Sequence, residues 1–182
     1  MKVALIDVMP VGDDYVAKEM AGGLGKRLRL RDTFLGSILN RNLNLRFNAP
    51  PIILAQLAGI FRAYGHRVNA YYTSETSKIE ADTAICVVLS SMVDYRNELQ
   101  FIQNLKKHLP DAKVMVVGSF VSAMPEVYLA DADFVIVGSP ESAVIKMLTE
   151  HMPEEKIVWS EDVENLDDLP MLDWVPFMKK SL

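Results

Sequence analysis

The sequence predicts an α/β fold of the flavodoxin-like (Rossmann-like), doubly wound type, with a mainly parallel sheet of five or six strands and helices on both faces. Three observations predict it. Short apolar runs rich in Val, Ile and Leu alternate along the chain with longer segments of helical spacing. Glycine and serine residues follow several of those runs, where strands would end. Strands that are separated by helices pair in parallel through right-handed crossovers.

The first predicted strand covers residues 2–8, a continuous apolar run of the kind that lies between two layers of helices. A long connection follows from residue 9 to residue 48. It is Gly-rich and then basic, and its apolar residues have the spacing of one or two short amphipathic helices. Pro50 and Pro51 suit the opening turn of the next helix, whose apolar residues recur at helical spacing until Gly65 ends it.

The rest of the chain predicts four strands, a possible edge strand and three helices. In chain order they are a strand at 67–72, a strand at 84–89, a helix from a cap at Asp94 to Leu109, a strand at 113–117, a short helix at 120–130, a strand at 134–137, a helix at 141–152 and an edge strand at 157–159. This repeated order of strand and helix places the strands in one sheet.

Length and composition indicate one compact domain, because 182 residues with 50% hydrophobic content bury one sizeable core and leave little for a second large one. The sequence predicts a domain at 1–160, with a basic insertion around 13–48, and an acidic, proline-punctuated linker at 161–182. Apolar residues from Met171 to Phe177 suggest a surface for a missing partner or domain.

Several kinds of protein are excluded by simple counts. The chain has no run of roughly eighteen apolar residues and begins directly with a strand, so we expect a soluble, cytoplasmic protein with no membrane partner. Cys86 is the only cysteine and lies in an apolar run, which predicts a buried thiol and excludes a disulfide framework within the chain.

The net charge of −5 argues against nucleic acid as a partner, and no aromatic residues interleave the basic ones to stack on bases. Positive charge gathers between Leu24 and Asn48, where six lysine and arginine residues stand against one aspartate. The sequence leaves two interpretations of this segment open. It is either a surface over a ligand or against a further domain, or a solvated, partly helical arm.

Ligands of an open parallel sheet bind at the carboxyl ends of the strands, so the residues after each predicted strand are the candidate site. Glycine admits a close approach of the backbone to a ligand, and hydroxyl groups form hydrogen bonds with its polar edges. The candidates are Asp7, Met9 and Gly12 after the first strand, Ser90 and Ser91 after the third, Gly118 and Ser119 after the fourth, and Gly138, Ser139 and Glu141 after the fifth.

Each candidate also has a purely structural interpretation. Asp7 braces a loop, and Ser90 and Ser91 cap the helix that begins near Asp94. Gly118 and Gly138 serve tight turns. Glu141 is a charge in the first turn of a helix.

The order of several segments resembles the N-terminal cobalamin (B12)-binding domain of B12-dependent radical SAM proteins. These segments are the proline-led first helix, Gly65-His66-Arg67-Val68, Ala81-Asp82, Gly118 with Pro125-Glu126 downstream, Asp133-Phe134-Val135 leading to Gly138 and Glu141, and the tail Leu166-Asp167-Asp168-Leu169-Pro170. Each segment is short, and their order and spacing carry the resemblance.

The resemblance implies that the chain binds cobalamin at the carboxyl edge of the sheet and presents it to a C-terminal radical SAM domain. That domain, with its S-adenosylmethionine and its [4Fe-4S] cluster, is not in this sequence. The full-length protein would be an enzyme, a methyltransferase or a related one. This chain alone is not expected to be catalytic, because it has no cluster cysteines.

Two positions depart from the family pattern. The wider family carries Asp-x-His-x-x-Gly in its first loop, where the histidine is the lower ligand of cobalt, and this chain has Asp7, Met9 and Gly12 in that frame. Histidine ligation from this loop is therefore excluded, which leaves Met9 or water near the metal. Ser119 stands where the family often has a second glycine.

The three histidines do not replace the missing ligand, because His66, His108 and His151 each follow a predicted helix and so lie at the opposite edge of the sheet. The departures keep a second function open, a cobalamin-free interaction or substrate-recognition module of a radical SAM protein. A flavin- or nucleotide-binding protein ranks last, because no hydroxyl-rich phosphate loop follows the first strand.

Overall fold

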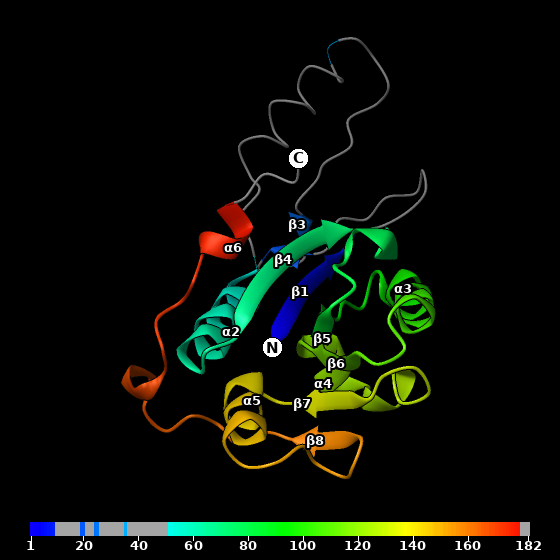
Figure 1. Cartoon of the computed structure of the whole chain (residues 1–182). Coiled ribbons are helices and arrows are strands. Elements are labelled where there is room, and N and C mark those ends of the chain that lie inside the picture. Colours follow the sequence, from blue (N-terminus) through cyan, green and yellow to red (C-terminus); the bar gives the residue numbers. More distant parts are fainter. Residues whose placement is uncertain (10–18, 21–23, 26–34, 36–50, 179–182) are drawn as a thin grey trace.

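The computed structural model describes residues 1–9, 19–20, 24–25, 35 and 51–178, and it has the predicted α/β architecture (Figure 1). Six parallel strands form one sheet in the order β4-β1-β5-β6-β7-β8. This is the flavodoxin-like order with a sixth strand added. Gly12 and the six basic residues between Leu24 and Asn48 lie outside the described residues.

The strands agree with the predicted ranges to within one residue. They are β1 (Lys2–Val8), β4 (Arg67–Thr73), β5 (Thr83–Leu89), β6 (Lys113–Val117), β7 (Phe134–Val137) and β8 (Ile157–Trp159). The predicted edge strand is confirmed, because β8 pairs in parallel with β7. An antiparallel pair that was not predicted, β2 (Glu19–Met20) and β3 (Leu24–Gly25), lies in the long connection after β1.

The helices are α2 (Ile52–Ala63), α3 (Tyr95–His108), α4 (Ser119–Ala123), α5 (Pro140–Thr149) and α6 (Val175–Met178), with short 3-10 turns at η1 (Thr76–Lys78), η2 (Pro125–Val127) and η3 (Leu166–Asp168). The predicted single helix over 120–130 is wrong. The chain leaves α4 at Met124 and begins η2 at Pro125. Proline has no N–H for a helical hydrogen bond and disfavours helical backbone in the residue before it.

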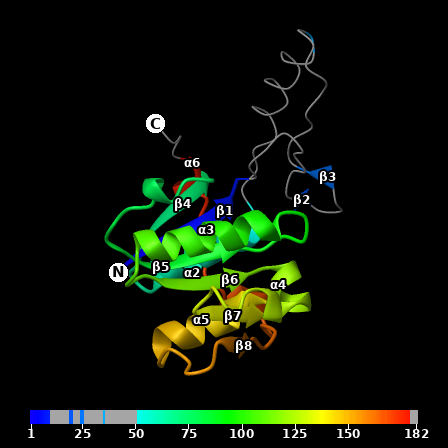
Figure 2. The same ribbon diagram turned by 90° about the vertical axis from the view of Figure 1, so that its right-hand side faces the viewer.

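Helices cover both faces of the sheet, α2 and α5 on one and α3 and α4 on the other (Figures 1 and 2). Successive residues of a strand point to opposite faces. Val3 and Leu5 of β1 accordingly belong to the core under α2, whereas Ala4 and Ile6 belong to the core under α3. Burial on both sides explains why the central strands β1, β5, β6 and β7 read as largely apolar runs.

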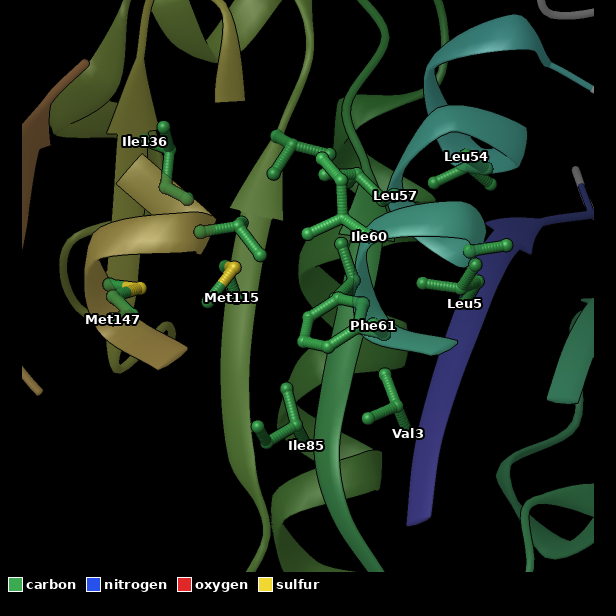
Figure 3. Close-up of a cluster of buried hydrophobic side chains, with 14 of the residues drawn as sticks. Val3, Leu5, Leu54, Leu57, Ile60, Phe61, Ile85, Met115, Ile136 and Met147 are labelled. Atoms are coloured by element: carbon green, nitrogen blue, oxygen red, sulfur yellow. The ribbon is translucent and has the colours of Figure 1, made fainter. Parts of the chain in front are cut away.

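Figure 3 shows the core under α2, where Ile60 and Phe61 of the helix lie over Val3 of β1 and Ile85 of β5. All four side chains are at most 2% exposed. Each fully buried side chain of this size contributes about 1.5–3 kcal/mol. This layer fixes α2 against the sheet.

The segment predicted as a linker turns back onto the domain. Leu169 and Phe177 pack against the core under α2, and α6 contacts β4. The division into a domain at 1–160 and a linker at 161–182 stays a prediction. Part of residues 161–182 nevertheless lies on the surface of the rest of the chain.

Candidate functional site

The carboxyl edge of the sheet has a topological switch point beside β1. The crossover from β1 to β4 uses α2 on one face, whereas the crossover from β5 to β6 uses α3 on the other face. Crossovers that diverge in this way leave a crevice outside the carboxyl ends of the two strands. Met9 after β1 and Ser90 after β5 stand on its two sides.

Asp7 and Met9 hold the end of β1. Asp7 lies opposite Tyr72 of β4, and its side chain is buried at 4% exposure. Met9 is half-buried, and its N–H donates to the carbonyl oxygen of Thr73 at 3.0 Å, which extends the pairing of β1 with β4 by one residue. Both residues are therefore fixed by the sheet and lie at its carboxyl edge.

Ser90 forms hydrogen bonds with β6 and α4, and not with α3, the helix that follows its own strand β5. Its hydroxyl oxygen accepts a hydrogen bond from the N–H of Val121 in α4 at 3.0 Å, and its N–H donates to the carbonyl oxygen of Val117 at 2.8 Å. The prediction that this side chain caps the helix near Asp94 is thus wrong. Parallel pairing of β5 with β6 brings Ser90 beside the start of α4.

Ser91 is held by a buried carboxylate. Its N–H donates to Oε2 of Glu98 at 3.2 Å, and the same oxygen accepts the hydroxyl hydrogen of Tyr128. Glu98 and Tyr128 are both 0% exposed. Burial, and next the charge of Glu98, raise the pKa of the Tyr128 hydroxyl well above its ordinary value, so Tyr128 is the donor in this pair.

Sequence reasoning missed this Glu98–Tyr128 pair, although one signal was present. Glu98 stands four residues before Ile102 and seven before Leu105, on the apolar stripe of its helix. A carboxylate in such a stripe needs a buried donor. The phenol of Tyr128 could not be identified as that donor, because it comes from a different element after α4.

Gly118 and Gly138 serve turns, as the structural interpretation predicted. Gly118 has φ +125, and a Cβ on it would lie 2.9 Å from Oγ of Ser90. Gly138 has φ +94, and its Cβ would lie 3.0 Å from the carbonyl oxygen of Ser160. The space beside each glycine is therefore taken by the protein's own atoms.

Two more serines bind this edge together and were not predicted. The hydroxyl of Ser122 donates to the carbonyl oxygen of Gly118 at 2.9 Å and accepts the N–H of Gly138 at 3.0 Å. Oγ of Ser160 accepts the N–H of Ala143 in α5 at 3.2 Å. We call Ser90, Ser122 and Ser160 the edge serines. They link successive strand ends to one another through the helices between them.

The remaining candidates are more open. Ser91 is half-buried, whereas Ser119 and Ser139 are exposed at the first positions after Gly118 and Gly138. Glu141 is half-buried in the first turn of α5, which is the helix charge that the structural interpretation predicted. The topology places all of these residues at one edge of the sheet. Ser119 and Ser139 therefore offer exposed hydroxyl groups at this edge.

The histidines lie at the other edge. His66 directly precedes β4, and its Nδ1 is 3.4 Å from the N-terminal nitrogen of Met1. Burial, and next the N-terminal charge, lower its pKa. His108 ends α3 ahead of β6, and His151 follows α5 ahead of β8. The predicted placement of all three is confirmed.

The described residues hold no group of three or more His, Cys, Asp or Glu side chains that could bind a metal ion. Cys86 is a free, buried thiol, as predicted, and burial raises its pKa to about 12. Among the helices in the described ranges, none has the length and apolar character to cross a membrane.

No protein-family model matches the sequence, and the curated proteins give no match. Among solved structures, the chain is similar to the N-terminal domain of a hypothetical protein from Thermotoga maritima. The two are 23% identical over 59% of this chain and 88% of that one, with a TM-score of 0.46.

Proposed function

We propose that this domain binds cobalamin at the carboxyl edge of its sheet, without a histidine lower ligand, and presents it to a radical SAM domain. The switch point between β1 and β5 carries the proposal, because ligands of doubly wound sheets bind in the crevice at that place. Met9 directly follows β1, and Ser90 and Ser91 directly follow β5, on the two sides of this switch point. The resemblance of the sequence to cobalamin-binding domains supplies the identity of the ligand.

The polar groups at this edge fit the outer part of such a ligand. Cobalamin carries amide side chains and a phosphate-bearing nucleotide tail, all of which hydroxyl groups can hydrogen-bond. Ser91, Ser119 and Ser139 offer three hydroxyls at partly or fully exposed positions. Ser90 and Ser160 fill the space beside the two turn glycines, so the fit rests on these hydroxyls and not on cavities at Gly118 and Gly138.

Met9 stands at the family's histidine position, and the thioether of this half-buried residue would pack beneath the corrin. A thioether is a soft and weak ligand, so water would compete with it. When bound, cobalamin supplies a cobalt that makes and breaks bonds to carbon. The domain's own residues would hold and orient the cofactor.

A cobalamin-free interaction module is the second candidate, and two observations favour it. Gly118 and Gly138 are explained by the packing of the chain on itself, with no ligand needed. Met92, Val93 and Met124, in the loops after β5 and α4, expose 68%, 44% and 44% of their surface. Exposed apolar side chains of this size suit contact with another protein.

Titration of the purified chain with hydroxocobalamin, followed by gel filtration and absorbance spectroscopy, tests the proposal. We expect stoichiometric retention of the cofactor with a spectrum that lacks histidine coordination. Ser119→Trp should block retention, because the indole fills the edge beside an exposed turn. Asp111→Trp is the matched control, since Asp111 is exposed in the turn before β6 at the opposite edge.

Met9→His provides the second arm of the test. It recreates the family's Asp-x-His-x-x-Gly pattern on Asp7 and Gly12. We expect binding to tighten by about tenfold, which corresponds to about 1.4 kcal/mol, and the spectrum to shift to histidine coordination. If the wild-type chain and Met9→His both fail to retain the cofactor while circular dichroism shows them folded, the interaction module becomes the better account.

A further inference from the structure

Trp159 is an exposed aromatic residue at the end of the outermost strand, β8 (Figure 1). Of its surface, 72% is exposed. A large aromatic side chain normally gains stability from burial, whereas single exposed apolar residues are common on protein surfaces. The groups that surround Trp159 therefore decide whether its exposure has a function.

The indole of Trp159 belongs to the face of the sheet that carries α3 and α4. Val158, the residue before it, packs against the core under α2, and successive residues of a strand point to opposite faces. The crossover from β7 to β8 uses α5, which packs on that same α2 side. On the other face, α4 contacts β6 and β7. Trp159 therefore stands on the strand next to those that α4 contacts.

Trp159 also lies at the carboxyl edge of the sheet, beside the turn at Gly138. It is the register partner of Val137, the residue before that turn. The N–H of Ser160 donates to the carbonyl oxygen of Val137 at 2.9 Å. A Cβ on Gly138 would lie 3.0 Å from the carbonyl oxygen of Ser160. The indole is therefore carried on backbone that is fixed to the end of β7.

Ser139 offers a hydroxyl group one residue beyond Gly138. It is the N-cap residue of α5, but its side chain forms no capping hydrogen bond with this helix. The hydroxyl oxygen of Ser160 accepts the N–H of Ala143 in α5 at 3.2 Å instead. Because Ser139 is also exposed, its hydroxyl is accessible to a ligand at the strand end beside Trp159.

Ser119 adds a second exposed hydroxyl, from α4. It precedes Ser122 by three residues, and residues three apart lie on the same side of a helix. The hydroxyl of Ser122 accepts the N–H of Gly138 at 3.0 Å, so this side of α4 faces the Gly138 turn. We call Ser119, Ser139 and Trp159 the Gly138 corner.

The Gly138 corner offers two kinds of contact to a ligand. An exposed indole stacks on the face of an aromatic base, and hydroxyl groups form hydrogen bonds with polar groups. Glu141, two residues after Ser139 in the first turn of α5, adds a carboxylate, which repels phosphate and accepts hydrogen bonds from sugar hydroxyls. A nucleoside carries an aromatic base and a sugar in one unit.

We propose that the Gly138 corner binds a nucleoside, with the base stacked on Trp159 and the sugar hydrogen-bonded to Ser119 and Ser139. This inference rests on the proposed function, because cobalamin ends in such a unit, a benzimidazole base on a ribose. The corner strand β8 lies three strands from β5. That is about 14 Å at the ordinary strand spacing, so a corrin ring at the switch point leaves the corner to the nucleotide tail.

Binding of hydroxocobalamin and of cobinamide, which lacks the phosphate, ribose and base, tests the corner by equilibrium dialysis. We expect Trp159→Ala to weaken the binding of hydroxocobalamin by roughly fivefold to thirtyfold, the loss of one stacked base, and to leave cobinamide unchanged. Ser139→Ala should weaken hydroxocobalamin by roughly threefold to tenfold, the net contribution of one hydrogen bond. Trp159→Phe should keep most of the affinity, because a phenyl ring still stacks.

Leu166→Ala is the matched control. It removes another exposed apolar side chain, 74% exposed in η3 and outside the corner, and should change neither affinity. The corner is wrong if the wild type and Trp159→Ala bind hydroxocobalamin equally well. The proposed function then still stands, because the cofactor is bound.

The free nucleoside of the cobalamin tail, α-ribazole, tests the corner if neither corrinoid binds. Trp174→Phe leaves Trp159 as the sole tryptophan. In this variant we expect α-ribazole to shift the one remaining indole N–H resonance in a saturable way, and Ser139→Ala to raise the half-saturating concentration. A saturable shift without corrinoid binding would keep the corner and contradict the proposed function. No shift and no corrinoid binding would overturn both.

Discussion

Oγ of Ser90 accepts the N–H of Val121 at 3.0 Å and so caps a helix from a neighbouring strand. Gly118 stands at the N-cap position of α4 and has no side chain to offer. The first N–H groups of a helix lack partners within it, and a side chain at the N-cap normally supplies one. Here the end of β5 supplies it, which couples the cap of α4 to the pairing of β5 with β6.

Ser90→Ala should therefore destabilise the protein by about 1–3 kcal/mol, because the N–H of buried Val121 loses its acceptor. The free energy of unfolding in urea measures this change. Ser74→Ala is the control, since Ser74 is exposed beyond the end of β4 and should cost less than about 0.5 kcal/mol. Equal values for the two variants would contradict the role of Ser90.

Glu98 and Tyr128 should be coupled more strongly than residues that do not touch. We expect a double-mutant cycle of Glu98→Gln and Tyr128→Phe to give a coupling energy of about 1–3 kcal/mol, because each change leaves the other group buried with a poorer partner. The control cycle pairs Tyr128→Phe with Ser74→Ala and should be additive within about 0.5 kcal/mol. Additivity in the first cycle would rule out the bond as a stabilising element.

Two glycines with positive φ provide a matched pair. Gly65 has φ +78, and a Cβ added there would have no atom within 4 Å, whereas Gly118 has φ +125 and its added Cβ would meet Ser90. Gly65→Ala should lower the free energy of unfolding by the backbone strain alone, about 1–2 kcal/mol. Gly118→Ala adds the steric overlap with Ser90 and should lower it by at least about 1 kcal/mol more. Urea unfolding of both variants checks the difference, and a smaller loss at Gly118 would show that its turn can relax.

The sheet was predicted closely because its central strands are buried on both faces. A run such as Val3 to Val8 reads as a strand whatever follows it, since two helix layers demand apolar side chains on both sides. The spacing of apolar residues could not predict where α4 ends, because it continues with helical spacing past Pro125. The backbone of Pro125, which has no N–H, ends the helix instead.

The candidate site was predicted in position but not in its bonds. Parallel topology alone places Ser90 and Gly118 at the carboxyl edge. The partner of Ser90 is 31 residues away in sequence, on a helix that begins beyond the next strand. Gly59 shows the same limit. A Cβ at this position would overlap the carbonyl oxygen of Met171, and only the folded chain brings these two residues together. No spacing rule along one segment carries such information.

Cys86 should make the protein less stable as the pH rises above 9. Burial raises the pKa of its thiol from 9.0 to about 12, so the folded protein keeps a proton that the unfolded chain loses. A raised pKa in the folded state means that the contribution is complete below pH 9 and is lost between pH 9 and about 12.

Between pH 8 and pH 10 the thiol should therefore lower the wild type's free energy of unfolding by about 1.4 kcal/mol. Above the unfolded pKa, the loss is about 1.4 kcal/mol per pH unit, because the folded protein keeps one proton that the unfolded chain releases. Cys86→Ala removes this term and keeps the tyrosines and lysines that titrate in the same range. The free energy of unfolding in urea, measured with a reductant at both pH values, should fall less in the variant by that amount. Parallel losses in the two proteins would mean that the thiol ionises equally well in the folded core.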